Sequence, residues 1–184
     1  MVNLIVKPKK CKSCKQQFEP LRFAQKVCSM KCAIEHSRAL SAKKDKKETR
    51  ERKKALKSRA EWLKECQAIF NKFIRMRDEG KPCISCGRYH TGQYHAGHYR
   101  TVGAAPELRF NEINCHKQCS VCNNHLSGNL LEYRRGLVAK IGIERVEWLE
   151  SKHEAKKYTI EEIQEIKKTY QQKIKELERD TNNH

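Results

Sequence analysis

The chain has 184 residues, enough for one ordinary domain or two small ones, and with 34% charged and 38% apolar residues a single large hydrophobic core is not expected. Lys and Arg number 40 against 22 Asp and Glu, and the formal net charge of +18 favours DNA as a partner over an anionic membrane surface. Because no apolar run approaches the roughly 18 residues of a spanning helix and no signal peptide follows Met1, we expect no membrane partner and a cytoplasmic location.

The first predicted element, residues 1–36, is a small zinc module. Its cysteines follow the pattern CxxC, thirteen residues, then CxxxC. In a chain without an export signal, such a set more often binds metal than forms disulfides. Phe18 and Phe23 are available as a miniature core that the metal would complete. Four thiolates can surround one zinc ion, and here they are Cys11, Cys14, Cys28 and Cys32.

Residues 37–59 contain "KKDKKETRERKK", a run with almost no apolar residues. This composition predicts a basic helix or a disordered linker. The segment is either a solvated spacer or an arm whose lysines neutralise DNA phosphates, and the sequence leaves both open.

Residues 60–184 are expected to form the last domain, with helices flanking a central cysteine region. Apolar residues at steps of three and four predict a first helix, closed by Gly80 and Pro82. Two further helices are expected, over "LLEYRRGLVAKIG" and over "YTIEEIQEIKKTYQQKIKELERD", the latter opened by a capping box from Thr159 to Glu162. The apolar positions of the three helices are Trp62, Cys66, Ile69, Phe70, Phe73 and Met76; Leu130, Leu137, Val138 and Ile141, with Arg134 on the same side; and Ile163, Ile166, Tyr170, Ile174 and Leu177.

The stripe on the last helix is narrow, and it suits packing either within the chain or against a second copy. The expected fold class is α+β and mostly helical. Tyr133 and Trp148 are expected in the core, and Cys66 and Cys115 as buried thiols outside any metal site.

Two CxxC pairs separated by 32 residues define the central region and predict a second zinc site. Its ligands are Cys83, Cys86, Cys119 and Cys122. Five of the eight histidines fall between or just beyond these cysteines: His90, His95, His98, His116 and His125. Because imidazole is both a general base near neutral pH and a common metal ligand, a catalytic metal beside the structural zinc is plausible. We expect His90 in a loop, and His36, His153 and His184 in solvent.

The order of residues in this region is similar to that of the HNH nucleases. After the first CxxC come His98, then Asn114, then the second CxxC followed at once by Asn123. The resemblance implies a ββα-metal fold, with His98 on one strand of a hairpin, Asn114 in the loop and Asn123 on a helix. In the zinc-bound subset of that family, two CxxC pairs clamp the hairpin to the helix.

A closer resemblance covers nearly the whole chain. The blocks "CISCG", "AGHYRT", "APELRFNE", "HKQC", "CN" and "SGNL", after "CxxC...CSxxC" and a basic stretch, resemble the phage NinG family, also called Rap. The resemblance implies a metal-dependent endonuclease that cuts branched DNA, such as Holliday junctions and D-loops, during phage recombination. If the chain is phage-encoded, its location is the host cytoplasm.

The same resemblance implies roles for individual residues. His98 matches the general base that takes a proton from the attacking water, and Asn114 matches the residue that orients the base or its loop. Asn123 matches the last metal ligand, with His125 as a rival. Gly97 stands where many relatives carry Asp or His as a metal ligand, so His95 and His116 are further candidates for the metal. Oxygen and imidazole ligands favour Mg²⁺ or Mn²⁺ there, while the thiolates favour zinc.

Arg100 and Arg109 flank this site in sequence and are candidates for a phosphate clamp, or are surface arginines of a basic protein. Two functions therefore remain: a structure-selective DNA endonuclease, or a zinc-containing recombination accessory protein that binds DNA without cutting it. Selectivity is expected to come from DNA shape. A symmetric four-way junction needs two cuts, and that geometry favours a homodimer.

Overall fold

The structure is a computed structural model that describes residues 7–182. It divides into two compact units, residues 1–57 and 58–184. The second unit begins two residues before the expected start of the last domain. His184 lies outside the described residues. The chain is mostly helical with two small antiparallel sheets, which confirms the α+β class.

The first unit consists of a zinc-type knuckle followed by a long helix. Strands β1 (Lys9–Lys10) and β2 (Gln17–Phe18) pair antiparallel, and α1 spans Met30–Ala55. Helix α1 begins inside the expected zinc module of residues 1–36, because Ser29 caps it: the Ser29 side chain accepts a hydrogen bond from the Cys32 amide. The basic segment is therefore helical as far as residue 55.

The predicted miniature core of Phe18 and Phe23 is not formed in this unit. Phe23 is 86% exposed, and Phe18 is half-buried. Within α1 only Cys32 is buried. A helix that is polar all round gains no burial energy from its own unit, so the cysteine cluster is the main element that can order the knuckle.

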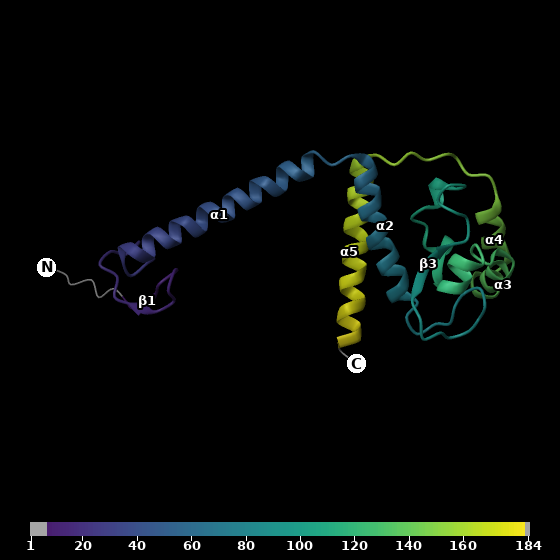
Figure 1. The fold of residues 1–184 in the computed structure, drawn as a ribbon, viewed down its shortest axis with the longest axis horizontal. Coiled ribbons are helices and arrows are strands. Elements are labelled where there is room, and N and C mark those ends of the chain that lie inside the picture. The colour runs from purple at the N-terminus through teal and green to yellow at the C-terminus, as the bar shows by residue number, and fades with distance from the viewer. Residues whose placement is uncertain (1–6, 183–184) are drawn as a thin grey trace. The chain divides into compact units, whose positions relative to one another are not determined.

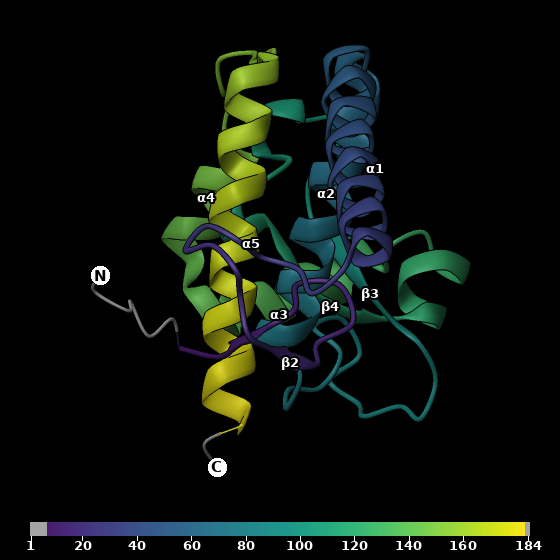
Figure 2. The same cartoon turned by 90° about the vertical axis from the view of Figure 1, so that its left-hand side faces the viewer.

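The second unit is built on two parallel helices, α2 (Arg59–Arg77) and α5 (Ile160–Asn182), which lie side by side in both views (Figure 1, Figure 2). Capping boxes start both helices: Ser58 with Glu61, and Thr159 with Glu162. The predicted apolar stripe of α5 packs on α2 within the chain. The shared core contains Trp62, Cys66, Phe70, Phe73, Ile163, Tyr170 and Ile174.

A two-stranded hairpin packs on the other side of α2 (Figure 1). Strand β3 (Tyr94–His98) pairs antiparallel with β4 (Cys115–Cys119), and Gly97 lies opposite His116. Ala96 packs against the α2 core, and Cys115 is fully buried in it, so this hairpin face is anchored to the helix. The helix expected after the hairpin is a five-residue π-helix, η3 (Val121–His125).

The connection between β3 and β4 contains the short 3-10 helices η1 (Pro106–Leu108) and η2 (Glu112–Asn114). It packs on α3 (Leu130–Ile141) and on α4 (Ile143–Glu150). The sequence analysis did not identify α4. This second core contains Ala105, Leu108, Leu137, Val146 and Leu149.

Several expectations for these helices change. Tyr133 is fully buried, as predicted, but Trp148 is 47% exposed and Leu130 is 48% exposed, so neither is a core residue. Arg134, which was expected on the apolar side of α3, forms an ion pair with Glu150 of α4, with Nε 2.8 Å from Oε1. Among the described residues no helix is long and apolar enough to cross a membrane.

Asp78, just after α2, ties that helix to the hairpin and to α3. Its carboxylate is almost fully buried, accepts hydrogen bonds from the Arg77 side chain and the Lys117 amide, and pairs with Lys81 and Lys140. Burial alone would raise the pKa of Asp78, but the hydrogen bond and charge of Arg77 outweigh it and hold this pKa well below its usual range. The end of α2 is thereby fixed against the strand that carries the second CxxC.

Candidate functional site

The first cysteine cluster fits a zinc ion. The sulfur atoms of Cys11, Cys14, Cys28 and Cys32 all lie within 4.8 Å of one another. The Cys14–Cys28 and Cys28–Cys32 sulfur distances are 3.7 and 3.5 Å, close to the roughly 3.8 Å between thiolates around tetrahedral zinc with bonds of about 2.3 Å. The Cys28 amide donates to Cys11 Sγ at 3.4 Å, a contact that stabilises a thiolate.

The second cluster joins a turn, a strand and the π-helix. The sulfurs of Cys83, Cys86, Cys119 and Cys122 also lie within 4.8 Å of one another, and three of the four residues are buried. The Cys119 amide donates to Cys83 Sγ at 3.3 Å, and Asn129 Nδ2 donates to Cys122 Sγ at 3.5 Å. A zinc ion here would clamp the hairpin to η3. His90 lies in the adjoining loop, as expected, with Nε2 3.2 Å from Cys86 Sγ.

His98 is the last residue of β3 and points toward α2. Its ring lies 6.0 Å from the ring of Phe70, and its Nε2 lies 2.9 Å from the Arg109 carbonyl oxygen. A carbonyl only accepts hydrogen bonds, so Nε2 carries the proton and Nδ1 keeps its lone pair. The buried Cys115 thiol lies 3.6 Å from Nδ1.

Burial lowers the pKa of His98, and the hydrogen bond to the Arg109 carbonyl offsets only part of that effect. Burial also raises the pKa of Cys115, which keeps the neighbouring thiol protonated. The imidazole is therefore neutral at physiological pH with a fixed tautomer, as a general base must be.

Asn114 fastens the loop that follows His98. Its Oδ1 accepts from the Arg100 amide at 2.8 Å, and its Nδ2 donates to the Arg100 and Leu108 carbonyls at 3.0 and 3.2 Å. The side chain is fully buried, and all three hydrogen bonds join it to backbone groups and not to a candidate metal ligand. Asn114 thus holds both ends of the loop whose Arg109 carbonyl orients His98.

The opposite face of the hairpin meets η3. Side chains alternate along a strand, so His95 and residue 97 face away from the side of His98. A Cβ added to Gly97 would lie 3.1 Å from Asn123 Oδ1 and 2.2 Å from Gln118 Oε1. The amide oxygens of Asn123 and Gln118 therefore converge beside Gly97. His95 Nε2 lies 3.5 Å from Asn124 Nδ2 on this face.

Gln118 is a site residue that the sequence analysis missed. It is almost fully buried, and its Nε2 donates to Ser85 Oγ at 2.7 Å and to the Gly128 carbonyl at 2.5 Å. These bonds direct Oε1 into the space that a side chain at position 97 would fill. The available signal was alternation in "HKQC", which puts Gln118 on the same strand face as His116.

The remaining candidate ligands do not gather around His98. His116 is buried beside the Tyr133 ring, its Nδ1 has no partner within residues 7–182, and burial followed by the charge of Lys140 lowers its pKa to about 3. His125 is exposed on η3. Within the described chain the two four-cysteine clusters are the groups of three or more His, Cys, Asp or Glu that can share an ion. The expected convergence of imidazoles with His98 is therefore not observed.

The two arginines proposed as a clamp have different surroundings. Arg100 is half-buried beside Asn114, whereas the Arg109 side chain lines a cleft on α2. Of the solvated histidines expected outside the site, His153 is half-buried against the Trp148 ring, at 4.6 Å, and His36 is also half-buried.

Adding a side chain at Gly97 is expected to be destabilising because Gln118 occupies the space. Gly97→Ala should lower the free energy of unfolding by about 1 to 3 kcal/mol, since Gln118 must move and its buried amide loses hydrogen bonds. The same substitution should cost much less in a Gln118→Ala background. Urea unfolding of the four proteins of this double-mutant cycle measures the difference, and equal costs in both backgrounds would contradict the contact.

Comparisons with known proteins identify the family. The family model described as Bacteriophage Lambda NinG protein matches residues 4–180. The chain is 44% identical to Protein ninG of Escherichia phage lambda, covering 95% of this chain and 96% of the relative. It is also 44% identical to Protein ninG of Salmonella phage P22, covering 92% and 93%. No solved structure was found to match. This chain therefore belongs to the NinG family of phage proteins.

Proposed function

We propose that this chain is a DNA endonuclease of phage recombination that cuts branched DNA, including Holliday junctions and D-loops. The observation that carries the proposal is the hydrogen bond between His98 Nε2 and the Arg109 carbonyl. It leaves Nδ1 as the neutral acceptor of the ring, and Nδ1 would exchange its 3.6 Å contact with the Cys115 thiol for the water that attacks a phosphodiester and would take the proton of that water.

The order of elements around His98 supports the same reaction. A strand ending in His98, a loop fastened by Asn114, a second strand and a short helix with Asn123 follow one another, and a zinc ion on the second cysteine cluster would lock them together. This is the order that the resemblance to HNH nucleases implies.

The proposed reaction uses a catalytic Mg²⁺ or Mn²⁺. Mg²⁺ is usually held by few protein oxygens, with water and substrate phosphates completing its shell, and so it does not require a cluster of imidazoles. The amide oxygens of Asn123 and Gln118 beside Gly97 are of the hard type that such an ion prefers. When bound it would neutralise charge on the phosphoryl group.

DNA binding is proposed to rest on backbone contacts. Helix α1 carries ten Lys or Arg against four Asp or Glu, and almost all of it is exposed. Such a helix would add contacts that depend on salt and not on base sequence. The α5 stripe is occupied by α2, so the homodimer is proposed from the need for two cuts in a symmetric junction.

The alternative is a recombination accessory protein that binds DNA without cutting it. It is favoured by one observation: His95, His116 and His125 do not gather with His98. The experiment that separates the two incubates the purified protein with a labelled four-way junction and a linear duplex of matching sequence, with Mg²⁺, with Mn²⁺ and with chelator. Cutting of the junction in preference to the duplex, and only with metal, supports the endonuclease. Tight binding without cutting in any metal supports the accessory role.

A further inference from the structure

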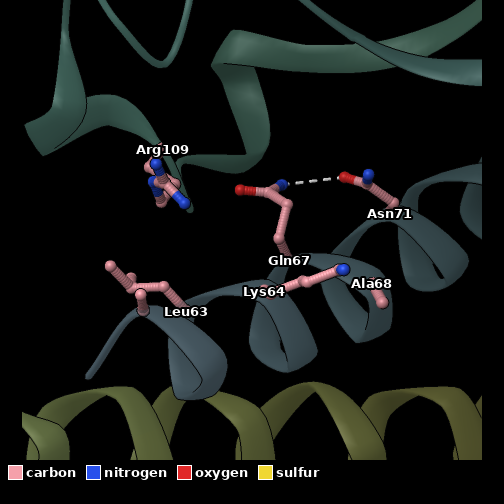
Figure 3. Close-up of a pocket in the computed structure, with 7 residues that line it drawn as sticks. Leu63, Lys64, Gln67, Ala68, Asn71 and Arg109 are labelled. Carbon is pink, nitrogen blue, oxygen red and sulfur yellow. Dashed lines mark hydrogen bonds between the residues drawn. The ribbon is translucent and has the colours of Figure 1, made fainter. Parts of the chain in front are cut away.

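A cleft of about 520 Å³ lies on α2, next to the residue that orients His98. One wall is the α2 surface with Leu63, Lys64, Gln67 and Asn71, and the other is Arg109 from the loop between β3 and β4 (Figure 3). Arg109 connects the two places, because its carbonyl holds His98 Nε2 while its guanidinium lines the cleft. A single residue, Arg109, would therefore connect a group bound in the cleft with the proposed base His98.

The cations of this cleft lack the acidic partners that other cations around α2 have. Arg77 pairs with Asp78, and Lys167 pairs with Glu65 at 2.7 Å. Neither the Lys64 ammonium nor the Arg109 guanidinium has a hydrogen bond or an ion pair in the part of the chain that the structure describes. Burial lowers the pKa of Arg109, so its environment favours a counter-ion.

Gln67 supplies the second, independent observation. Its Nε2 donates to Asn71 Oδ1 at 2.8 Å, which fixes the amide and turns Oε1 toward the side of Arg109 (Figure 3). Oε1 is inaccessible to solvent and accepts no hydrogen bond from the described residues. A buried acceptor without a donor costs about 1 to 3 kcal/mol, and the guanidinium across the cleft has five N–H donors.

We propose that this cleft binds a DNA backbone phosphate other than the scissile one, with Lys64 and Arg109 as its cations and Gln67 as the positioning residue of Arg109. On binding, the guanidinium donates to Gln67 Oε1 with one edge and to the phosphate with another, so the unpaired acceptor and the unpaired cations are satisfied together. Lys64, and not Arg100, is then the cation that contacts this phosphate together with Arg109. The inference rests on the proposed DNA-directed function.

The test measures binding to the four-way junction in chelator, by fluorescence anisotropy between about 50 and 200 mM salt. Loss of one phosphate contact lowers the magnitude of the slope of log affinity against log salt by about 0.9. Because Lys64 and Arg109 share one phosphate, Lys64→Gln and Arg109→Gln should each lower this magnitude by part of that amount and the double variant by about 0.9 in total, while Lys64→Arg should keep the wild-type slope. Arg75→Gln is the matched control. It removes one exposed charge from the same helix, eleven residues and about 16 Å further along, and should leave the slope unchanged.

Gln67→Leu tests the positioning role without changing charge. It should weaken junction binding several-fold in the wild-type background and have no further effect in Arg109→Gln, because Gln67 acts through that guanidinium. If the salt slopes of Lys64→Gln and Arg75→Gln fall equally, the proposal of a phosphate site in the cleft is overturned, while the proposed endonuclease function is not affected. Failure of the wild-type protein to bind either DNA would instead overturn the proposed function.

Discussion

His98→Ala is expected to lower the rate of junction cleavage by about 10² to 10⁴, the usual contribution of a general base. DNA affinity measured in chelator should change little, because His98 is half-buried and its Nε2 contacts the protein backbone. The matched control is His125→Ala, which removes an exposed imidazole from η3 and should keep most of the activity if Asn123 and not His125 is the functional residue.

The substitution also removes packing against Phe70, so the thermal midpoint and circular dichroism of each variant must be measured beside the rate. A folded His98→Ala protein that still cuts the junction at the wild-type rate would rule out His98 as the base. Loss of cleavage in His125→Ala alone would identify His125 on η3 as the general base.

The pH dependence has a definite sign. The base acts when it is unprotonated, and burial holds the pKa of His98 below its usual 6.5. The cleavage rate should therefore stay level as pH falls to 6.5 and decline only below it. Stability follows the same direction: unfolded His98 binds the proton more readily, so its contribution to the free energy of unfolding is complete above pH 6.5 and is lost as pH falls toward the folded pKa.

Removal of zinc is expected to unfold the knuckle of residues 7–29 and to loosen the hairpin, while α2 and α5 stay packed. The knuckle has Phe23 exposed and almost no apolar core, so metal binding must supply most of its folding energy, which for structural zinc sites is on the order of 10 kcal/mol. The α2 and α5 pair keeps a core that includes Phe70 and Ile163 and contains no zinc ligand.

Metal content and amide protection measure this difference. The wild-type protein should hold two zinc ions per chain, one for each cysteine cluster. Cys122→Ser should weaken one of them and abolish cleavage, because that zinc joins β4 to η3, whereas Cys66→Ala, which removes a buried thiol outside both clusters, should keep both ions. Cooperative loss of α2 and α5 on chelation would contradict the expected independence of that core.

Local patterns in this sequence were sufficient for several elements. The predicted capping box from Thr159 to Glu162 involves residues three apart, so its hydrogen bonds depend little on distant segments. The cysteine spacings likewise predicted both clusters, because a CxxC turn already places two sulfurs together. A helix was expected at η3 from the family resemblance, but its π type was not predicted. Helix α4 was not predicted at all, since its eight residues make only about two turns and give a weak periodic signal.

The candidate site was predictable only in part. Strand alternation alone places His98 and residue 97 on opposite faces, which the motif order does not reveal. What covers each face depends on distant segments: α2 covers His98, and η3 with Gln118 covers Gly97. For this reason His98, on one face of the hairpin, and His95 and His116, on the other, do not form one ligand group.

The sequence by itself determined the two four-cysteine sets, the helical stripes and the resemblance to a family, whereas it left the basic segment open as a helix or a linker. Only the tertiary structure decided that the α5 stripe packs on α2 of the same chain, that the Arg109 carbonyl sets the tautomer of His98, and that the Arg109 side chain faces Lys64 and Gln67. The physical reason is that hydrophobic burial is non-directional, so a stripe specifies that its area must be covered and not which segment covers it. Hydrogen bonds between residues tens of positions apart exist only after that choice has been made.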